Sequence, residues 1–361
     1  MSRENVYNFS AGPSMMPASV LERAAAEISD YRSSGMSVME MSHRSGLFND
    51  IFQETKAKLR AALNVPDSHE ILFLQGGATL QFAAIPLNLM GNGGSADYAV
   101  TGNFSSLAAK EAEKYGSVHI ACSSEDKNHS YIPDSVSLSP SASYFYYCAN
   151  NTIYGTEWQS VPEVGERTLV CDMSSDILSK PVDVGRFGLI YAGAQKNMAP
   201  AGLTVVIVRR DLAGREMDIC PSVMSYDTLI KKDSMLNTPP CWCIYMLGLM
   251  LDWLESVGGV CQMQSIKRER AQLIYDVLDN SRLYIPHARP DSRSDMNVTF
   301  RTGSEELDAQ FVKGAAAQGL LNLKGHRLTG GIRASLYNAM PMEGARALAE
   351  YMKKFEVEHN V

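Results

Sequence analysis

The sequence predicts an α/β fold in which a mostly parallel central sheet is flanked by helices and followed by a smaller α+β part. Two observations support this fold class. Through about the first 260 residues, short apolar runs alternate with amphipathic stretches at helical spacing, which is typical of a parallel sheet covered on both faces. Beyond that point, charged helical stretches alternate with short strand-like runs. A chain of 361 residues can bury a large core and form two or three domains.

Two early helices are predicted from apolar residues at helical spacing. They span 18–32 and 49–63, with Pro17 and Pro66 at their boundaries. Short runs rich in branched or aromatic residues predict buried strands, because near-continuous apolar runs fit a sheet that is covered on both faces. The predicted strands are 71–74, 98–101, 144–149, 169–171, 189–192 and 204–208.

A long helix is expected from about Pro240 to Ser256. Pro239 and Pro240 would lie in its first turn, where a missing N–H donor costs little. The Gly258-Gly259 pair is expected to end this helix.

The C-terminal part is predicted to mix helices and strands. Its expected elements are a helix at 260–280, a strand at 297–301, a helix near 305–318, a strand at 332–336 and a final helix from Met342. We therefore expect a large domain at 16–260 and a small domain made of 1–15 and 261–361. A pocket between two such domains is the default place for a functional site.

Composition excludes several classes of function. The net charge of −7 argues against a general binder of nucleic acid or anionic membranes, because both need an extended basic field. A few converging arginines can still bind a small anion. The longest apolar stretch, 244–254, is broken by Asp252 and is too short to span a bilayer. The N-terminal residues contain no apolar segment of the signal-peptide type. We therefore expect no membrane or nucleic-acid partner.

The cysteines indicate a reducing compartment. There are seven, an odd number, and no pair has zinc-site spacing; Cys241 and Cys243 form only a C-x-C pair. Small buried thiols account for them. We therefore expect a cytoplasmic protein without a metal site.

Lys196 follows a strand that runs out into small residues, Ala192-Gly193-Ala194. Local periodicity alone favours a solvated loop lysine. The alternative is a lysine at the carboxyl end of a parallel strand, where α/β folds place their ligands. A partly desolvated lysine there can act as a Schiff-base nucleophile.

Asp172 supports the second alternative. It ends a strand 24 residues before Lys196, a separation that suits one strand, one connection and the next strand. Both side chains would then emerge at the same edge of the sheet. A carboxylate there can pair with the protonated pyridine nitrogen of pyridoxal phosphate. An equally simple interpretation is that Asp172 caps a turn with Ser174 and Ser175.

A glycine turn precedes another helical stretch. The strand 71–74 leads into Gln75-Gly76-Gly77-Ala78-Thr79, and helical spacing follows through about Leu89. This geometry offers free backbone N–H groups to a phosphate, although Gly-Gly turns are also common connectors. Neither nucleotide-binding glycine fingerprint is present.

Eight ordered segments identify the sequence further. They are 8–13 (NFSAGP), 41–45 (MSHRS), 75–78 (QGGA), 172–175 (DMSS), 190–197 (IYAGAQKN), 237–240 (NTPP), 293–298 (RSDMNV) and 325–335 (GHRLTGGIRAS). In these segments the sequence resembles the phosphoserine aminotransferases, a group within class V of the fold-type-I pyridoxal-phosphate enzymes. The resemblance runs nearly from end to end, and 190–197 is its most specific segment.

The resemblance implies a set of residues that hold pyridoxal 5′-phosphate. Lys196 would carry the cofactor as a Schiff base, Asp172 would pair with its ring nitrogen, and Thr152 would bond its phenolic oxygen. The residues implied to hold the cofactor phosphate are Ala78, Thr79 and Gln195, with Asn237 and Thr238 from the neighbouring subunit of a homodimer. Asn237 and Thr238 are also ordinary N-cap residues before a helix.

One position departs from the commonest family pattern. Many relatives place a tryptophan over the cofactor ring, whereas this sequence has Phe104. A phenyl ring can still stack on the pyridine face with a smaller contact area.

The resemblance also implies which residues bind the substrate. Arg333 matches the arginine for the α-carboxylate, and a bidentate pair gives both energy and orientation. His43, Arg44, His326 and Arg327 are the candidates for the distal phosphate of phosphoserine or the γ-carboxylate of glutamate. Each would otherwise be assigned to a surface ion pair.

The implied function is reversible transamination between 3-phosphohydroxypyruvate and L-glutamate, giving O-phospho-L-serine and 2-oxoglutarate in serine biosynthesis. The 4-phosphooxy-L-threonine reaction of pyridoxine biosynthesis is a possible second activity. The nearest rival is a class-V aminotransferase for another amino acid. A non-catalytic protein that keeps the fold would be expected to have lost Lys196 or Asp172, and both are present.

Overall fold

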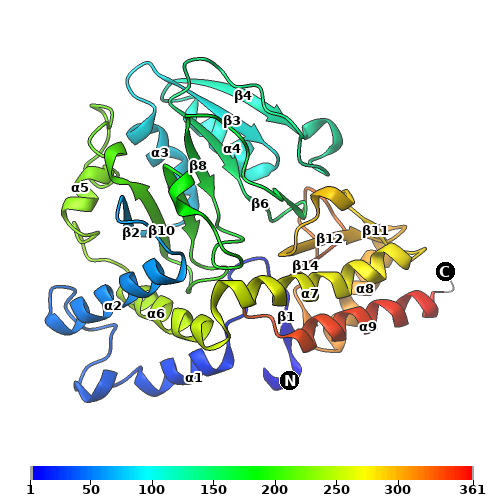
Figure 1. Cartoon of the computed structure of the whole chain (residues 1–361). Coiled ribbons are helices and arrows are strands. Elements are labelled where there is room, and N and C mark those ends of the chain that lie inside the picture. The colour runs from blue at the N-terminus through cyan, green and yellow to red at the C-terminus, as the bar shows by residue number, and fades with distance from the viewer. Residues whose placement is uncertain (1–2, 360–361) are drawn as a thin grey trace.

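The computed structural model describes residues 3–359, so residues 1, 2, 360 and 361 of the predicted small domain lie outside the described part. A seven-stranded sheet forms its centre (Figure 1). In spatial order the strands are β2 (His69–Gln75), β10 (Leu203–Arg209), β9 (Leu189–Gly193), β8 (Thr168–Asp172), β5 (Tyr144–Cys148), β3 (Ser95–Val100) and β4 (Ser117–Ser123).

Most of this sheet is parallel, as predicted. Strands β9, β8, β5, β3 and β4 pair in parallel, whereas β10 is antiparallel to both β9 and β2. Only residues 194–202 connect β9 to β10, and this is too short for the crossover that a parallel pair requires. The carboxyl ends of β8 and β9 meet at one edge, where Asp172 lies opposite Tyr191.

Helices cover both faces of the sheet, which confirms the predicted α/β class. Alternate strand residues point to opposite faces, so neighbours such as Tyr146 and Tyr147 enter different hydrophobic clusters. One cluster packs the sheet against α3 (Gln81–Leu89), α4 (Asn103–Ala112) and α5 (Tyr226–Lys231). The other packs it against α1 (Ala18–Glu27), α2 (Gly46–Ala62) and α6 (Cys241–Ser256).

Several helix ends differ from the predicted ones. Helix α1 ends at Glu27 rather than at residue 32, because the Asp30 carboxylate accepts a hydrogen bond from the Gly35 N–H and closes a turn. Helix α2 starts three residues early, since the Ser45 hydroxyl caps it by accepting from the Phe48 N–H. The two prolines before α6 lie outside its first turn, with Pro240 at the N-cap.

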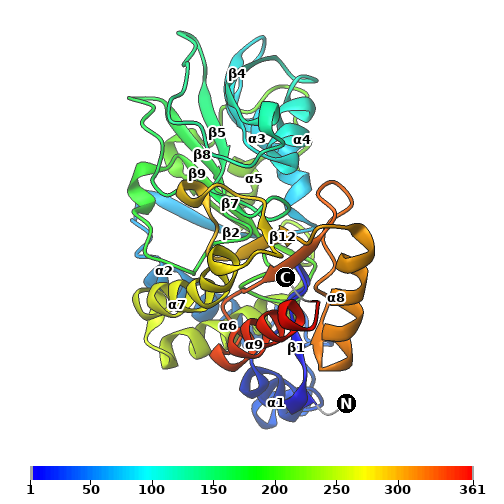
Figure 2. The ribbon, with the colours of Figure 1, turned by 90° about the vertical axis from the view of Figure 1, so that its right-hand side faces the viewer.

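The C-terminal part contains a three-stranded antiparallel sheet with helices beside it. Its elements are α7 (Gly259–Asn280), β11 (Ile285–Pro286), β12 (Asn297–Arg301), α8 (Glu305–Ala317), β13 (Leu320–Leu321), β14 (Ile332–Ser335) and α9 (Met342–Glu358). The N-terminal strand β1 (Tyr7–Asn8) pairs in parallel with β13, and Phe9 joins the C-terminal hydrophobic cluster. Figure 2 shows β1 close to the C-terminal helix α9. The domain boundaries at residues 16 and 260 stay a prediction.

Short elements complete the described chain. A small hairpin is formed by β6 (Asn150–Asn151) and β7 (Thr156–Glu157). The 3₁₀ helices are η1 (Arg3–Asn5), η2 (Tyr31–Ser33), η3 (Ala78–Leu80), η4 (Glu125–Lys127), η5 (Val184–Arg186), η6 (Arg210–Leu212) and η7 (Pro290–Ser292). Within residues 3–359, no single helix is both long and apolar enough to cross a membrane; α6 and α7 meet the length and composition test only as a pair bent by 77°.

A buried ion cluster joins hairpin strand β7 to helix α7. The Glu157 carboxylate lies 2.5 Å from Lys180 Nζ and 3.2 Å from Lys267 Nζ, and it also accepts a hydrogen bond from the Asp295 N–H. Burial alone would raise the pKa of Glu157, but the Lys267 and Lys180 ammonium groups outweigh that effect and hold the pKa at about 2. The cluster therefore links the sheet part to the C-terminal part through charge.

Candidate active site

Lys196 lies in the turn after β9, at the carboxyl edge of the sheet. Its Nζ donates a hydrogen bond of 2.9 Å to Thr152 Oγ1 and lies 5.7 Å from the centre of the Phe104 ring. The side chain is half-buried, and among residues 3–359 it forms no ion pair with a carboxylate. This position matches the lysine at a strand end rather than the solvated loop lysine.

Asp172 ends the neighbouring strand β8 with only 5% of its surface exposed. One carboxylate oxygen accepts a hydrogen bond of 2.8 Å from the Ser174 N–H, as the turn-cap interpretation predicts. The other oxygen accepts a hydrogen bond of 3.0 Å from the Tyr191 hydroxyl. Capping the turn therefore occupies only part of this buried carboxylate.

The Gly76-Gly77 turn brings a helix start next to the end of β9. Gly76 adopts a φ of +94°, which favours glycine, and 3₁₀ helix η3 begins at Ala78. The first N–H groups of a helix have no intrahelical partner. A Cβ placed on Gly193 would lie 3.4 Å from Ala78 Cβ and 2.8 Å from Gln195 Oε1, so these segments converge around a glycine.

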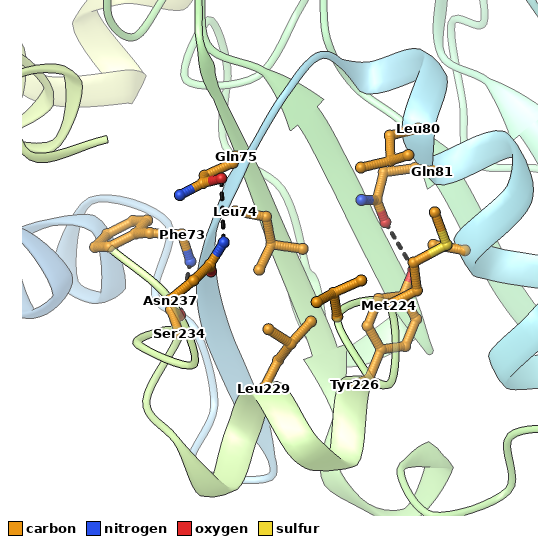
Figure 3. A pocket seen from close by; sticks show the side chains of 12 residues that line it. Phe73, Leu74, Gln75, Leu80, Gln81, Met224, Tyr226, Leu229, Ser234 and Asn237 are labelled. Carbon is orange, nitrogen blue, oxygen red and sulfur yellow. Dashed lines mark hydrogen bonds between the residues drawn. The ribbon is translucent and has the colours of Figure 1, made fainter. Parts of the chain in front are cut away.

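Asn237 and Thr238 lie near this turn, on the exposed side of β2. Asn237 Nδ2 donates to Gln75 Oε1 at 3.3 Å, and the Gln75 amide donates to the Thr238 carbonyl. Neither residue caps a helix, because the N-cap of α6 is Pro240; the N-cap interpretation is wrong. Figure 3 shows Asn237 and Gln75 at the rim of a pocket of about 240 Å³ bounded by β2 and α5. Their contribution to a neighbouring subunit stays a prediction.

Arg333 comes from β14, an edge strand of the C-terminal sheet. Its guanidinium is half-buried, and no hydrogen bond or ion pair to it occurs within the described chain. Burial lowers the pKa of Arg333 from its ordinary value. An arginine without a carboxylate partner is available to bind an anion.

His326 and Arg327 share the loop before β14 with Arg333 near them. Burial lowers the pKa of His326, and the Arg333 and Arg327 charges lower it further, so these cations are close. His43 and Arg44 lie apart in sequence, before α2, and no hydrogen bond or ion pair within residues 3–359 connects them to the other two. His43 Nε2 is buried there without a hydrogen-bond partner, while Arg44 is exposed.

The N-terminal segment is part of this region as well. Gly12 has a φ of +130°, and a Cβ at this position would lie 3.3 Å from Lys196 Cγ. The Ser14 N–H donates to the Gln195 carbonyl at 3.0 Å, and the Ser14 hydroxyl donates to the Lys196 carbonyl. The segment 8–13 matched the family motif, but no local signal in it predicts contact with Lys196.

The sequence pattern predicts no functional contact for Tyr191 or Tyr146. Tyr191 stood inside a strand-like apolar run, where an aromatic residue fits a buried sheet. Its pairing with Asp172 follows from the register of β8 and β9, so strand alignment is the signal that could have found it.

These residues fit a pyridoxal-phosphate group. A primary amine, a neutral hydroxyl and an aromatic ring surround one position at Lys196, Thr152 and Phe104. A buried carboxylate lies at the end of the neighbouring strand, and the missing side chain of Gly193 lets the Gln195 amide and Ala78 of η3 approach the end of β9. The donor set therefore suits a cofactor with an aldehyde, a phenolic oxygen, a basic ring nitrogen and a phosphate.

Comparison with known proteins assigns the family. The model of the family "Aminotransferase class-V" matches residues 6–348. A phosphoserine aminotransferase of Pseudomonas aeruginosa is 49% identical over 358 residues, covering 99% of each chain. The solved phosphoserine aminotransferase of Bacillus circulans subsp. alkalophilus is 46% identical, with a TM-score of 0.97 over 99% of this chain and all of that one. A PLP-bound phosphoserine aminotransferase from Trichomonas vaginalis is 40% identical, with a TM-score of 0.93 over 96% and 99% of the two chains. The sheet, Lys196 and the residues around Lys196 agree with this match, and the chain belongs to the class-V aminotransferase family.

Proposed function

We propose that this chain is a pyridoxal-phosphate-dependent aminotransferase that interconverts 3-phosphohydroxypyruvate and L-glutamate with O-phospho-L-serine and 2-oxoglutarate. The similarity to phosphoserine aminotransferases over 99% of the chain carries the proposal. The placement of Lys196 between Thr152 and Phe104 supports it, because an aminotransferase needs a held, reactive amine. The reaction would serve serine biosynthesis.

The cofactor-binding roles follow from the chemistry of each residue. Bound pyridoxal phosphate supplies an electron sink that stabilises negative charge at the substrate α-carbon. Asp172 would face the ring nitrogen, Thr152 the phenolic oxygen and Phe104 one face of the ring. The residues that would hold the phosphate are Ala78, Thr79 and Gln195, with Asn237 and Thr238 from a second subunit.

Lys196 would have two tasks. Its amine holds the cofactor covalently before the substrate arrives. The same amine would also hold or move a proton at the substrate α-carbon as a general acid and base. The hydrogen bond from Nζ to Thr152 Oγ1 gives the amine a fixed direction.

The substrate anions would be bound by the cations of the C-terminal loop and of the segment before α2. Arg333 would take the α-carboxylate with its free guanidinium. His326 and Arg327, together with His43 and Arg44, would take the phosphate or the γ-carboxylate. We further propose a homodimer in which Asn237 and Thr238 of each subunit reach the site of the other.

A reducing compartment suits this protein. All seven cysteines lie among the described residues, and none forms a disulfide. We therefore propose the cytoplasm as its location.

The 4-phosphooxy-L-threonine reaction is a second candidate activity, because that substrate keeps both anionic groups.

A half-reaction assay tests the proposal. The purified protein is loaded with pyridoxal phosphate, mixed with O-phospho-L-serine and followed by cofactor absorbance. We expect rapid conversion to the amine form of the cofactor, with glutamate as the other efficient donor and alanine and aspartate as poor donors. A protein that stays colourless with added cofactor, or prefers another donor, would contradict the proposal. Lys196→Ala should lose both the absorbance of lysine-bound cofactor and turnover.

A further inference from the structure

Two buried tyrosines form a series of hydrogen bonds that ends at the carboxylate of Asp172. The Tyr191 hydroxyl lies 3.0 Å from Asp172 Oδ2, and the Tyr146 hydroxyl lies 2.7 Å from that of Tyr191. Tyr191 is 0% exposed and Tyr146 is 1% exposed. Both come from strands of the central sheet, and the rings lie nearly parallel, with an interplanar angle of 30°. The array therefore ends on the carboxylate and nowhere reaches solvent.

The direction of the hydrogen bonds follows from the number of protons. A charged carboxylate can only accept, so Tyr191 must donate its single hydroxyl proton to Asp172. The bond between the two hydroxyls must then run from Tyr146 to Tyr191. Hydrogen bonds in such a chain polarise one another, which strengthens the final bond to the charged group.

Both tyrosines keep their protons under ordinary conditions. Burial first, and then the nearby Asp172 charge, raise the pKa of Tyr191 well above its usual value, and the same two causes act in the same order on Tyr146. The two tyrosine hydroxyls therefore remain hydrogen-bond donors in the direction of Asp172.

We propose that Tyr191, supported by Tyr146, is a positioning residue that keeps Asp172 charged and aims its carboxylate at the ring nitrogen of the cofactor. The proposal rests on the proposed function and deepens it. With Oδ1 bound by the Ser174 N–H and Oδ2 by Tyr191, both oxygens of Asp172 have a fixed direction. A buried carboxylate without these donors would lose stabilisation of its charged form, and with it the ability to keep the ring nitrogen protonated.

The same sheet contains a matched control. Tyr144 and Tyr98 form another hydroxyl–hydroxyl bond of 2.7 Å, both are buried, and Tyr144 forms no hydrogen bond to Asp172. Tyr144→Phe therefore removes a similar buried bond from the same strand that carries Tyr146. A purely structural role for the tyrosines predicts equal consequences for the variants.

The test compares Tyr191→Phe, Tyr146→Phe and Tyr144→Phe as full-length proteins. Three quantities are measured: the kcat and KM for O-phosphoserine, the affinity of the apoprotein for pyridoxal phosphate by equilibrium dialysis, and the ¹⁵N chemical shift of the bound cofactor's ring nitrogen. Loss of a hydrogen bond to a charged group changes an equilibrium or rate constant by roughly 10-fold to 100-fold. We expect Tyr191→Phe to lower kcat by about that factor, with KM nearly unchanged, to weaken cofactor binding and to move the ring-nitrogen signal toward the unprotonated form.

Tyr146→Phe should act in the same direction with a smaller effect, and Tyr144→Phe should match the wild type in all three measurements. If Tyr191→Phe does not fold, Tyr146→Phe still tests the proposal, because it leaves the bond from Tyr191 to Asp172 in place. A ring-nitrogen shift unchanged in both variants, or changed equally by Tyr144→Phe, overturns the positioning role. Wild-type protein that binds no pyridoxal phosphate would instead overturn the proposed function itself.

Discussion

Glu157→Gln tests the buried ion cluster that joins β7 to α7. The substitution removes one negative charge and keeps the shape of the side chain. Lys267, which is only 1% exposed, then retains a single carboxylate neighbour, Asp295 Oδ2 at 3.8 Å. Lys180 keeps Asp176 at 3.5 Å. The variant therefore leaves a buried ammonium group with little compensation.

The expected loss can be worked out in two ways. Breaking a buried ion pair by removing one partner costs about 3–5 kcal/mol. The displacement of the Glu157 pKa from 4.5 to about 2 corresponds to roughly 3 kcal/mol at neutral pH. With an unfolding entropy of about 2 cal/mol/K per residue over 361 residues, this loss lowers Tm by about 4–7 °C.

Differential scanning calorimetry of the apoprotein at pH 7 measures this change. Glu163→Gln is the control, because Glu163 pairs with Arg186 at 2.9 Å but is 88% exposed, and it should leave Tm unchanged. Adding Lys267→Met to Glu157→Gln should recover part of the loss, since it removes the uncompensated charge. Equal Tm values for Glu157→Gln and Glu163→Gln, or a further large loss in the double variant, would show that Glu157 does not compensate the buried charge of Lys267.

The pH dependence of the Tm difference between wild type and Glu157→Gln follows from the lowered pKa of Glu157. The folded pKa of Glu157 lies below its unfolded value, so the unfolded chain binds the proton first as the pH falls. The stabilisation is thus complete above about pH 4.5 and is lost as the pH falls toward about 2. The Tm gap between wild type and Glu157→Gln should therefore shrink between pH 4.5 and pH 3.5.

Three further predictions concern the site. Thr152→Val removes the 2.9 Å partner of Lys196 Nζ, so the absorbance maximum of bound cofactor should shift and kcat should fall about 10-fold in a stopped-flow assay; an unchanged spectrum would contradict the contact. Phe104→Leu should weaken cofactor binding by roughly 2-fold to 10-fold in equilibrium dialysis with little change in kcat, because it removes only ring stacking. Arg333→Lys should raise the KM for glutamate by roughly 10-fold to 100-fold while cofactor absorbance stays the same, since lysine cannot bind a carboxylate through a planar fork; a normal KM would exclude Arg333 from the α-carboxylate site.

The sequence predicted the sheet best where strands are buried on both faces. The runs at 71–74 and 144–149 fall on β2 and β5, whose residues are mostly buried. Strand β4 was missed because only Ala121 among its residues is buried, so it lacks the continuous apolar run of the other strands. Helix α4 was missed too, since the residues that it buries are a serine and three alanines, with no large apolar side chain among them.

The residues of the site that could be predicted from the sequence are those that follow neighbouring parallel strands. The separation of Asp172 from Lys196 suggested neighbouring strands, and β8 and β9 are neighbours in parallel. Tyr191 could not be distinguished from a core residue, because its role depends on register rather than on composition. The placement of His43 and Arg44 depends on contacts between segments far apart, or between subunits, which local pattern does not contain.

The N-terminal segment has a consequence for synthesis of the protein. Tyr7 and Asn8 are synthesised about 310 residues before their strand partners, Leu320 and Leu321. Gly12 and Ser14, which border Lys196, follow directly after this strand. A nascent chain can therefore complete the surroundings of its lysine only after Leu321 has been made, so chains that stop before this residue would not carry a fully assembled site.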